Sequence, residues 1–221
     1  MKGLTHQTEK VFEAISQLPF IREYTLIGGS ALAMQIHHRL SEDLDFCIWT
    51  KNPKKEKPIV DWPGIEKELG MVGRITSRDI LGFDHVNFLL DGVKLTFITK
   101  QKNLSPVNKP VSLSNHVFAA DLEAIGAMKI ELILRRSEFR DYYDIYSILK
   151  TGISLKNLVS LATKYSNYLL KTRDALAFLS HGANYRKEMN FELLKPLYLV
   201  NSKEIEEFMR LLILKEYGTQ Q

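Results

Sequence analysis

The sequence contains a single cysteine, Cys47, so it can form no internal disulfide and lacks the thiols of a zinc knuckle. Cys47 lies within an apolar run without cationic neighbours, and this setting favours a buried structural thiol over a nucleophile. Disulfide scaffolds and zinc knuckles are therefore excluded.

Long apolar runs are also missing from the sequence. Runs such as residues 211–214 are far too short to cross a bilayer, and residues 1–10 are polar and lack the apolar core of a signal peptide. The formal charge of +4 is a small excess for 221 residues, so it favours phosphate-bearing partners only weakly. We therefore expect a soluble, cytoplasmic protein that does not associate with a membrane.

The sequence has neither internal repeats nor low-complexity tracts, and 45% hydrophobic with 25% charged residues is typical of a globular fold. In the first half, the spacing of apolar residues alternates between helical and strand periods. It predicts helices at residues 8–18, 31–37 and 59–69, with Ser30 as the N-cap of the second, and strands at residues 24–27, 44–49, 73–80, 85–90 and 93–99. Asp91-Gly92, between the last two strands, predicts a hairpin turn of type I′.

The second half changes to long helical periods. Helices are predicted at residues 121–134, 139–149, 155–165, 168–179 and 204–214. A polar loop with proline at residues 100–110 precedes this change. We therefore expect an α/β domain at residues 1–110, with a small mixed β-sheet flanked by helices, followed by an α-helical C-terminal domain at residues 111–221.

Gly28 and Gly29 follow the first short strand and precede a helix that starts near Ser30. Glycines let the backbone turn sharply and approach a ligand closely, and the N–H groups at a helix start bind phosphates. The glycine pair suits a nucleoside triphosphate, although a glycine pair before a helix is more commonly an ordinary turn.

Asp43 and Asp45 lie at the start of the next strand. Residues two apart in a strand project from the same face, so the two carboxylates are predicted to lie side by side. A hard cation such as Mg²⁺ would relieve the repulsion between the two carboxylates. For an isolated pair, the simpler explanation is that Asp43 caps a turn and Asp45 lies at an exposed strand end. A glycine turn followed by a carboxylate pair favours phosphoryl transfer, because the turn can bind phosphates and the carboxylates can bind a metal ion.

Two blocks of the sequence, which together span roughly half of the chain, resemble a known family. The first block comprises Gly28-Gly29-Ser30-Ala31-Leu32, His37-His38-Arg39, Ser41 and Asp43-Leu44-Asp45-Phe46. The second comprises Ala127-Met128-Lys129, Arg136 and Arg140-Asp141-Tyr142-Tyr143-Asp144-Ile145-Tyr146. The chain thereby resembles the AbiEii/AbiGii toxin family of nucleotidyltransferases, a branch of the polymerase β-like superfamily.

The resemblance implies a nucleotidyltransferase fold and roles for some of the matching residues. The metal ligands for Mg²⁺ or Mn²⁺ would be Asp43 and Asp45, and the nucleotide-binding residues would be Gly28, Gly29, Ser30, Arg39 and Lys129. Lys129 and Asp141 would complete the pocket from the helical half and act as catalytic residues with Asp43 and Asp45. From the residue pattern alone, solvated surface charges are the simpler explanation of Lys129, Asp141 and Asp144.

The sequence departs from the superfamily at one position. A third carboxylate is expected on a later strand, but residues 93–98 place Thr96 there. Asp84, Asp91 or Asp141 would have to substitute in positioning a metal and activating the attacking hydroxyl. Otherwise the protein binds a nucleotide without transferring it.

Three further groups of residues have less specific patterns. His37-His38 has no additional His or Cys at ligand spacing, so we expect one imidazole to pack and the other to meet solvent. The helical spacing of Tyr142, Tyr143 and Tyr146 is more typical of core packing than of base stacking. A solvated basic loop, with RNA contact as the alternative, is predicted at Lys51, Lys54, Lys55 and Lys57.

The function that the resemblance implies is Mg²⁺-dependent transfer of a nucleotidyl group from a nucleoside triphosphate to a macromolecular acceptor, either RNA such as tRNA or a protein hydroxyl. The protein would be the toxin of a bacterial toxin–antitoxin or abortive-infection system, with a cognate antitoxin as partner. Two alternatives stay open. One is a catalytically impaired nucleotide-binding or interaction module of the same fold, motivated by Thr96, and the other is an RNA-binding bundle that uses only the basic helical half.

Overall fold

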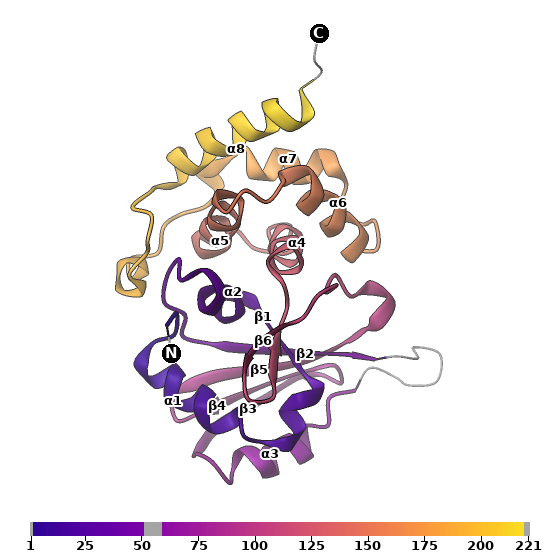
Figure 1. The fold of residues 1–221 in the computed structure, drawn as a ribbon, viewed down its shortest axis with the longest axis vertical. Helices are drawn as coiled ribbons and strands as arrows, with labels where there is room; N and C mark the ends of the chain where they lie inside the picture. Colours follow the sequence, from indigo (N-terminus) through magenta and orange to yellow (C-terminus); the bar gives the residue numbers. More distant parts are fainter. Residues whose placement is uncertain (1, 51–58, 219–221) are drawn as a thin grey trace. The chain divides into compact units, whose positions relative to one another are not determined.

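The computed structural model of the protein describes residues 2–50 and 59–218. The chain forms two compact units, Met1–Asp121 and Leu122–Gln221, whose elements are labelled in Figure 1. The division falls beyond the expected position at residue 110, because two strands after that residue join the sheet of the first unit. The predicted basic loop of Lys51, Lys54, Lys55 and Lys57 lies outside the described residues.

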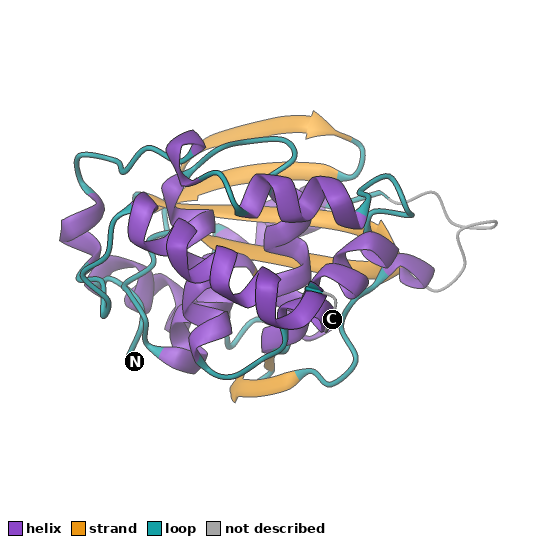
Figure 2. Ribbon diagram, turned by 90° about the horizontal axis from the view of Figure 1, so that it is seen from above, coloured by secondary structure: helices purple, strands orange, loops and turns teal. Residues whose placement is uncertain are grey.

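The first unit is built on a mixed seven-stranded sheet with the strand order β3-β4-β5-β2-β1-β7-β6. The strands are β1 Thr25–Ile27, β2 Leu44–Thr50, β3 Ile75–Gly82, β4 His85–Leu90, β5 Val93–Gln101, β6 Val111–Ser114 and β7 Val117–Ala119. β2 pairs in parallel with β5, and β1 pairs in parallel with β7, while the other neighbours are antiparallel. Figure 2 shows the long strands of this sheet side by side. The sequence pattern does not predict β6 and β7, because such short strands show too little alternation.

The helices of the first unit are α1 His6–Ile15, α2 Gly28–Ile36 and α3 Trp62–Leu69, with the 3₁₀ turns η1 Pro19–Glu23 and η2 Lys102–Leu104. Figure 1 shows α1 and α3 on one side of the sheet and α2 on the other. On the α1 side, the buried ring of Phe97 contacts the rings of Phe20, Tyr24, Phe46 and Phe88. Burial of these large rings makes that side an apolar core, and Asp45 and Thr96, which precede the paired residues Phe46 and Phe97, project from the opposite face.

The second unit consists of helices. They are α4 Leu122–Leu132, α5 Phe139–Lys150, α6 Leu155–Tyr165, α7 Thr172–Leu179 and α8 Ser202–Tyr217, with the 3₁₀ turns η3 Gly182–Asn184 and η4 Phe191–Leu194. Tyr142 and Tyr143 on α5 are fully buried, and their rings contact those of Tyr185 and Phe191. This confirms the prediction that the tyrosines of this helix pack in a core.

Several local predictions are confirmed, and one is wrong. Asp91 and Gly92 both have a positive φ, at 46° and 80°, as a type I′ turn requires. Cys47 is fully buried, as expected for a structural thiol. Ser30 is not an N-cap, because α2 already begins at Gly28 with Ile27 as its N-cap. No helix in the described parts of the chain is long and apolar enough to span a membrane.

Candidate functional site

The glycine pair and the carboxylate pair are brought together in the first unit. β1 and β2 are antiparallel neighbours in which Ile27 pairs with Asp45, so the start of β2 lies beside the beginning of α2. Gly28 has a φ of +73°, in the left-handed region that glycine adopts without strain. A Cβ at Gly28 would lie 2.5 Å from Asp45 Oδ2, so glycine also leaves room for this carboxylate.

Gly29 leaves room for a guanidinium. A Cβ at Gly29 would lie 2.7 Å from Arg39 Nη2 and 3.3 Å from Ser41 Oγ. Arg39 is only 5% exposed, and its Nη1 donates to the carbonyl oxygen of Leu40 at 2.9 Å. The start of α2 therefore has a nearly buried cation beside Gly29 and a carboxylate beside Gly28.

Ser30 joins the first turn of α2 to the approach to β2. Its hydroxyl donates to the main-chain carbonyl oxygen of Asp43, and the side chain is only 1% exposed. Because that hydroxyl is engaged within the protein, what Ser30 offers a ligand is its main-chain N–H. The first N–H groups of a helix have no acceptor within the helix and carry its partial positive charge.

Thr96 lies beside Asp45, because these two residues are paired across the parallel strands β5 and β2. The strand predicted to carry the third acid is thus the neighbour of β2, and a threonine occupies the paired position. Asp84 and Asp91 lie in the turns at the two ends of β4, at least about 10 Å along the strand from the residue that pairs with Thr96. The structure therefore brings neither of them beside Asp45.

Asn87 is a residue of this region that the sequence analysis does not single out. It pairs with Thr96 across β4 and β5, and its neighbours Val86 and Phe88 are buried in the core on the opposite face. Asn87 Oδ1 is buried and has no hydrogen-bond partner among the described residues. The only signal in the sequence is one polar residue between two apolar ones in a predicted strand.

Lys129 and the two aspartates of the second block form a buried ion cluster within the second unit. Lys129 Nζ lies 2.6 Å from Asp141 Oδ1 and 2.8 Å from Asp144 Oδ2, and Arg136 Nε lies 2.7 Å from Asp141 Oδ2. Lys129 is 6% exposed, while Asp141 and Asp144 are fully buried. The interpretation of these residues as solvated surface charges is therefore wrong, because α4 and α5 pack with the charged groups between them.

The cluster keeps Asp141 ionised. Burial by itself acts to raise the pKa of Asp141, but the Lys129 ammonium and the Arg136 guanidinium outweigh it and hold that pKa below its ordinary value. Asp141 and Asp144 lie three residues apart on α5, so both carboxylates face the same side of the helix and reach one ammonium.

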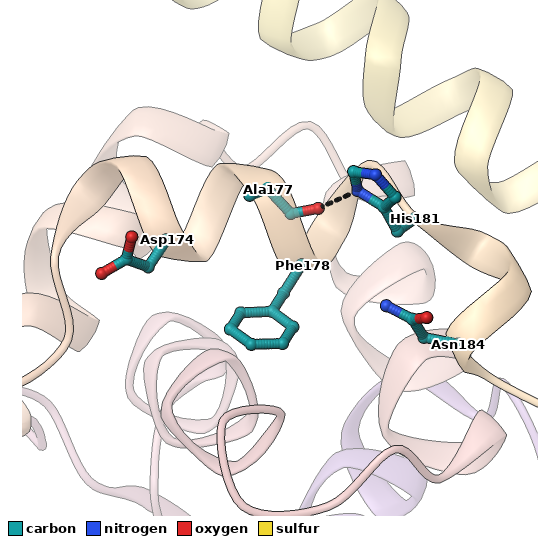
Figure 3. A pocket seen from close by; sticks show the side chains of 5 residues that line it. All are labelled: Asp174, Ala177, Phe178, His181 and Asn184. Atoms are coloured by element: carbon teal, nitrogen blue, oxygen red, sulfur yellow. Dashed lines mark hydrogen bonds between the residues drawn. The ribbon is translucent and has the colours of Figure 1, made fainter.

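The two histidines divide as predicted, since His38 is fully buried and His37 is exposed at the end of α2. The second unit contains a pocket of about 470 Å³ whose lining includes no predicted site residue. Its lining side chains are shown in Figure 3. It is lined by Asp174, Ala177, Phe178, His181 and Asn184. Its imidazole is already paired, with His181 Nδ1 2.6 Å from the Ala177 carbonyl oxygen.

The described residues contain no group of three or more His, Cys, Asp or Glu side chains arranged to hold a metal ion. Near the start of α2, the structure places the Asp45 carboxylate against Gly28 and the main-chain carbonyl of Asp43 against the Ser30 hydroxyl. A divalent cation there would need neutral protein oxygens, water or ligand phosphates to complete its coordination.

Two comparisons by sequence and one by structure relate the chain to known proteins. The family model described as "Nucleotidyl transferase AbiEii toxin, Type IV TA system" matches residues 10–216. An uncharacterized protein of Aquifex aeolicus (strain VF5) is 28% identical over 223 residues, which cover 98% of each chain. The fold is similar to that of MenT4, a nucleotidyltransferase toxin from Mycobacterium tuberculosis H37Rv, with a TM-score of 0.60 and 14% identity over 93% of this chain and 81% of that one. Since the family match extends over nearly the whole sequence, the protein belongs to the AbiEii family of nucleotidyltransferase toxins of type IV toxin–antitoxin systems.

Proposed function

We propose that the protein catalyses Mg²⁺-dependent transfer of a nucleotidyl group from a nucleoside triphosphate to an RNA acceptor such as tRNA, in the cytoplasm. The observation that carries this proposal is the position of the Asp45 carboxylate against Gly28, at the start of α2. A carboxylate and the first main-chain N–H groups of a helix, which have no acceptor within that helix, lie in one small region, which suits joint binding of a cation and a polyphosphate.

The outer phosphates of the nucleotide are assigned to the first turn of α2. Gly28 and Gly29 have no side chains to keep a phosphate away from the main chain, and the N–H groups of Gly29 and Ser30 point along the positive end of the helix. The guanidinium of Arg39 adds a full positive charge close to Gly29. Because Arg39 is nearly buried, water screens this charge less than it would at the surface.

The cation is assigned to Asp43 and Asp45. The residues fit such an ion, because hard cations take carboxylate oxygens and the glycine at position 28 keeps a side chain out of the space against Asp45 Oδ2. When bound, Mg²⁺ or Mn²⁺ would neutralise negative charge on the triphosphate and stabilise the charge that develops during transfer. The Ser30 hydroxyl contributes by holding the main chain of Asp43 close to the start of α2.

The chemistry then requires mainly positioning. An acceptor hydroxyl oxygen forms a bond to the α-phosphorus, the bond from that phosphorus to the bridging oxygen breaks, and pyrophosphate leaves while the hydroxyl proton passes to solvent. Arg39 and the α2 N–H groups hold the leaving phosphates and stabilise their charge.

The catalytic roles of Lys129 and Asp141 stay predictions. Within the second unit, Lys129 is already paired with two carboxylates, so a purely structural role also accounts for its burial. The two roles have different consequences. A structural role predicts that replacement of Lys129 lowers stability, whereas a catalytic role predicts that a variant that still folds, such as Lys129→Arg, loses transfer activity.

The proposal is tested by incubating the purified protein with each α-labelled nucleoside triphosphate, Mg²⁺ and total tRNA. We expect label on RNA with the wild-type protein and a loss of roughly 100-fold or more with Asp43→Asn or Asp45→Asn, at unchanged circular dichroism. Asp84→Asn is the matched control, because Asp84 lies in the exposed turn between β3 and β4 of the same unit. Full activity of either Asn variant would contradict the assignment of the cation to these aspartates.

The same assay separates the alternatives. Label on protein instead of RNA would identify a protein hydroxyl as the acceptor, and nucleotide binding without transfer would support the impaired module that Thr96 suggests. Membership of a toxin–antitoxin family also implies a cognate antitoxin. We expect co-expression of the antitoxin to relieve growth inhibition by the wild-type protein. The Asp45→Asn variant should not inhibit growth, either with or without the antitoxin.

A further inference from the structure

A row of polar side chains crosses the sheet on the side of α2. Asp45 on β2 pairs with Thr96 on β5, and Thr96 pairs with Asn87 on β4. Paired residues on neighbouring strands project from the same face, with strands about 4.8 Å apart. The three side chains therefore stand next to one another in a line that begins at the carboxylate against Gly28.

The middle member of the row is the shortest. Threonine carries its oxygen on the β-carbon, whereas Asp45 and Asn87 extend one atom further on either side of it. Because of this difference, the ends of the two longer side chains flank the position above Thr96. Asn87 Oδ1 is buried without a hydrogen-bond partner in the described parts of the chain, and a buried acceptor of this kind is destabilising unless a bound molecule donates to it.

The charge of this region is low for a cation site. Asp43 and Asp45 contribute two carboxylates, and the structure places Asp84 and Asp91 at the ends of β4, away from the row. The guanidinium of Arg39 beside Gly29 further reduces the negative potential. Affinity for divalent cations falls as charged oxygen ligands are replaced by neutral ones.

We propose that Thr96 and Asn87 take the place of the missing third carboxylate with neutral oxygens, and that cation binding therefore depends on a bound nucleotide. Thr96 Oγ1 and Asn87 Oδ1 would accept hydrogen bonds from water that hydrates a cation held by Asp45, so both are positioning residues. The protein alone binds the cation weakly, and the triphosphate supplies the remaining negative charge. This inference rests on the proposed function, because it concerns the same site.

The test restores the acid and measures metal binding without any nucleotide. The full-length wild-type protein, Thr96→Asp and Asn87→Asp are titrated with Mn²⁺ alone, and free Mn²⁺ is followed by electron paramagnetic resonance. We expect each variant to bind Mn²⁺ roughly tenfold or more tightly than the wild-type protein, because a third carboxylate joins Asp45. Asn87→Asp replaces only the amide nitrogen of the side chain by oxygen, so we expect this variant to fold. It therefore still tests the inference if Thr96→Asp does not fold.

The matched control is Ser77→Asp, which adds the same charge on β3. Ser77 is exposed, and three strand spacings separate β3 from β2, which is about 14 Å. We expect this variant to bind Mn²⁺ like the wild-type protein. Unchanged affinity in both Thr96→Asp and Asn87→Asp, or an equal gain in Ser77→Asp, would overturn the inference.

The outcome is separable from that of the transfer assay. If neither Asp variant gains Mn²⁺ affinity while Asp45→Asn abolishes label transfer, the row is not part of the cation site and the proposed function stands. If the gain occurs while the wild-type protein transfers no label, the geometry of the row holds and the proposed function fails.

Discussion

Replacement of Gly28 by alanine is expected to lower transfer activity about 100-fold while leaving the protein folded. The residue has a φ of +73°, and an alanine in the left-handed region destabilises a fold by about 1–2 kcal/mol. In addition, the new Cβ would lie 2.5 Å from Asp45 Oδ2, so the carboxylate has to rotate away. Displacement of a catalytic group by about 1 Å lowers the rate by roughly 100-fold, and we expect a loss of label transfer of this size.

Gly92→Ala separates the two effects of this substitution. Gly92 also has a positive φ, at 80°, but a Cβ there would meet no atom within 4 Å. Both variants are therefore expected to lower the melting temperature by about 2–8 °C in thermal unfolding followed by circular dichroism. Only Gly28→Ala should lose Mg²⁺-dependent nucleotide binding and label transfer. Equal transfer activity of the two variants would refute the reasoning, because the contact with Asp45 would then have no consequence.

Three further predictions concern the buried charges and the thiol. Lys129→Met is expected to lower the free energy of unfolding in urea by about 3–5 kcal/mol, because it leaves Asp141 and Asp144 buried without their common partner. The control Arg210→Met removes an exposed ion pair of the same unit and should change this free energy by less than about 1 kcal/mol. Similar losses in the two variants would contradict the buried cluster. The pKa of Asp141 is lower in the folded than in the unfolded protein, so its ionisation stabilises the fold above about pH 3.9, and this contribution is lost as the pH falls below that value. The free energy of unfolding of Asp141→Asn should therefore depend less on pH, between pH 5 and pH 2, than that of the wild-type protein. Burial raises the pKa of the Cys47 thiol, so iodoacetamide should modify Cys47 only in unfolded protein; rapid modification under native conditions would show that the thiol is accessible.

The sequence is sufficient for features that depend on local spacing. The Asp91-Gly92 turn, the helix Leu155–Tyr165 and the strand His85–Leu90 form where their patterns predict them. The proposal that the glycine pair and the two aspartates form a site also comes from short-range order. Ser30 is misassigned as an N-cap, because α2 begins two residues earlier and the Ser30 hydroxyl donates to the Asp43 carbonyl oxygen instead of capping the helix.

Features that depend on contacts between distant segments escape the sequence pattern. β7 pairs with β1 across a long stretch of chain, so its place in the sheet, and with it the end of the first unit, follows from tertiary pairing. Asn87 becomes part of the candidate site only because β4 and β5 bring it next to Thr96. Lys129 and Asp141 have the same sequence pattern whether they face solvent or one another, and only the packing of α4 on α5 decides.

The central claim is that Asp45, held against Gly28, binds a divalent cation together with the phosphates of a nucleotide. Isothermal titration of a nucleoside triphosphate into the wild-type protein and into Asp45→Asn, each with and without Mg²⁺, tests it most directly. The account predicts that Mg²⁺ strengthens binding to the wild-type protein and has little effect on binding to Asp45→Asn. An equal Mg²⁺-dependent gain in affinity for both proteins would contradict it.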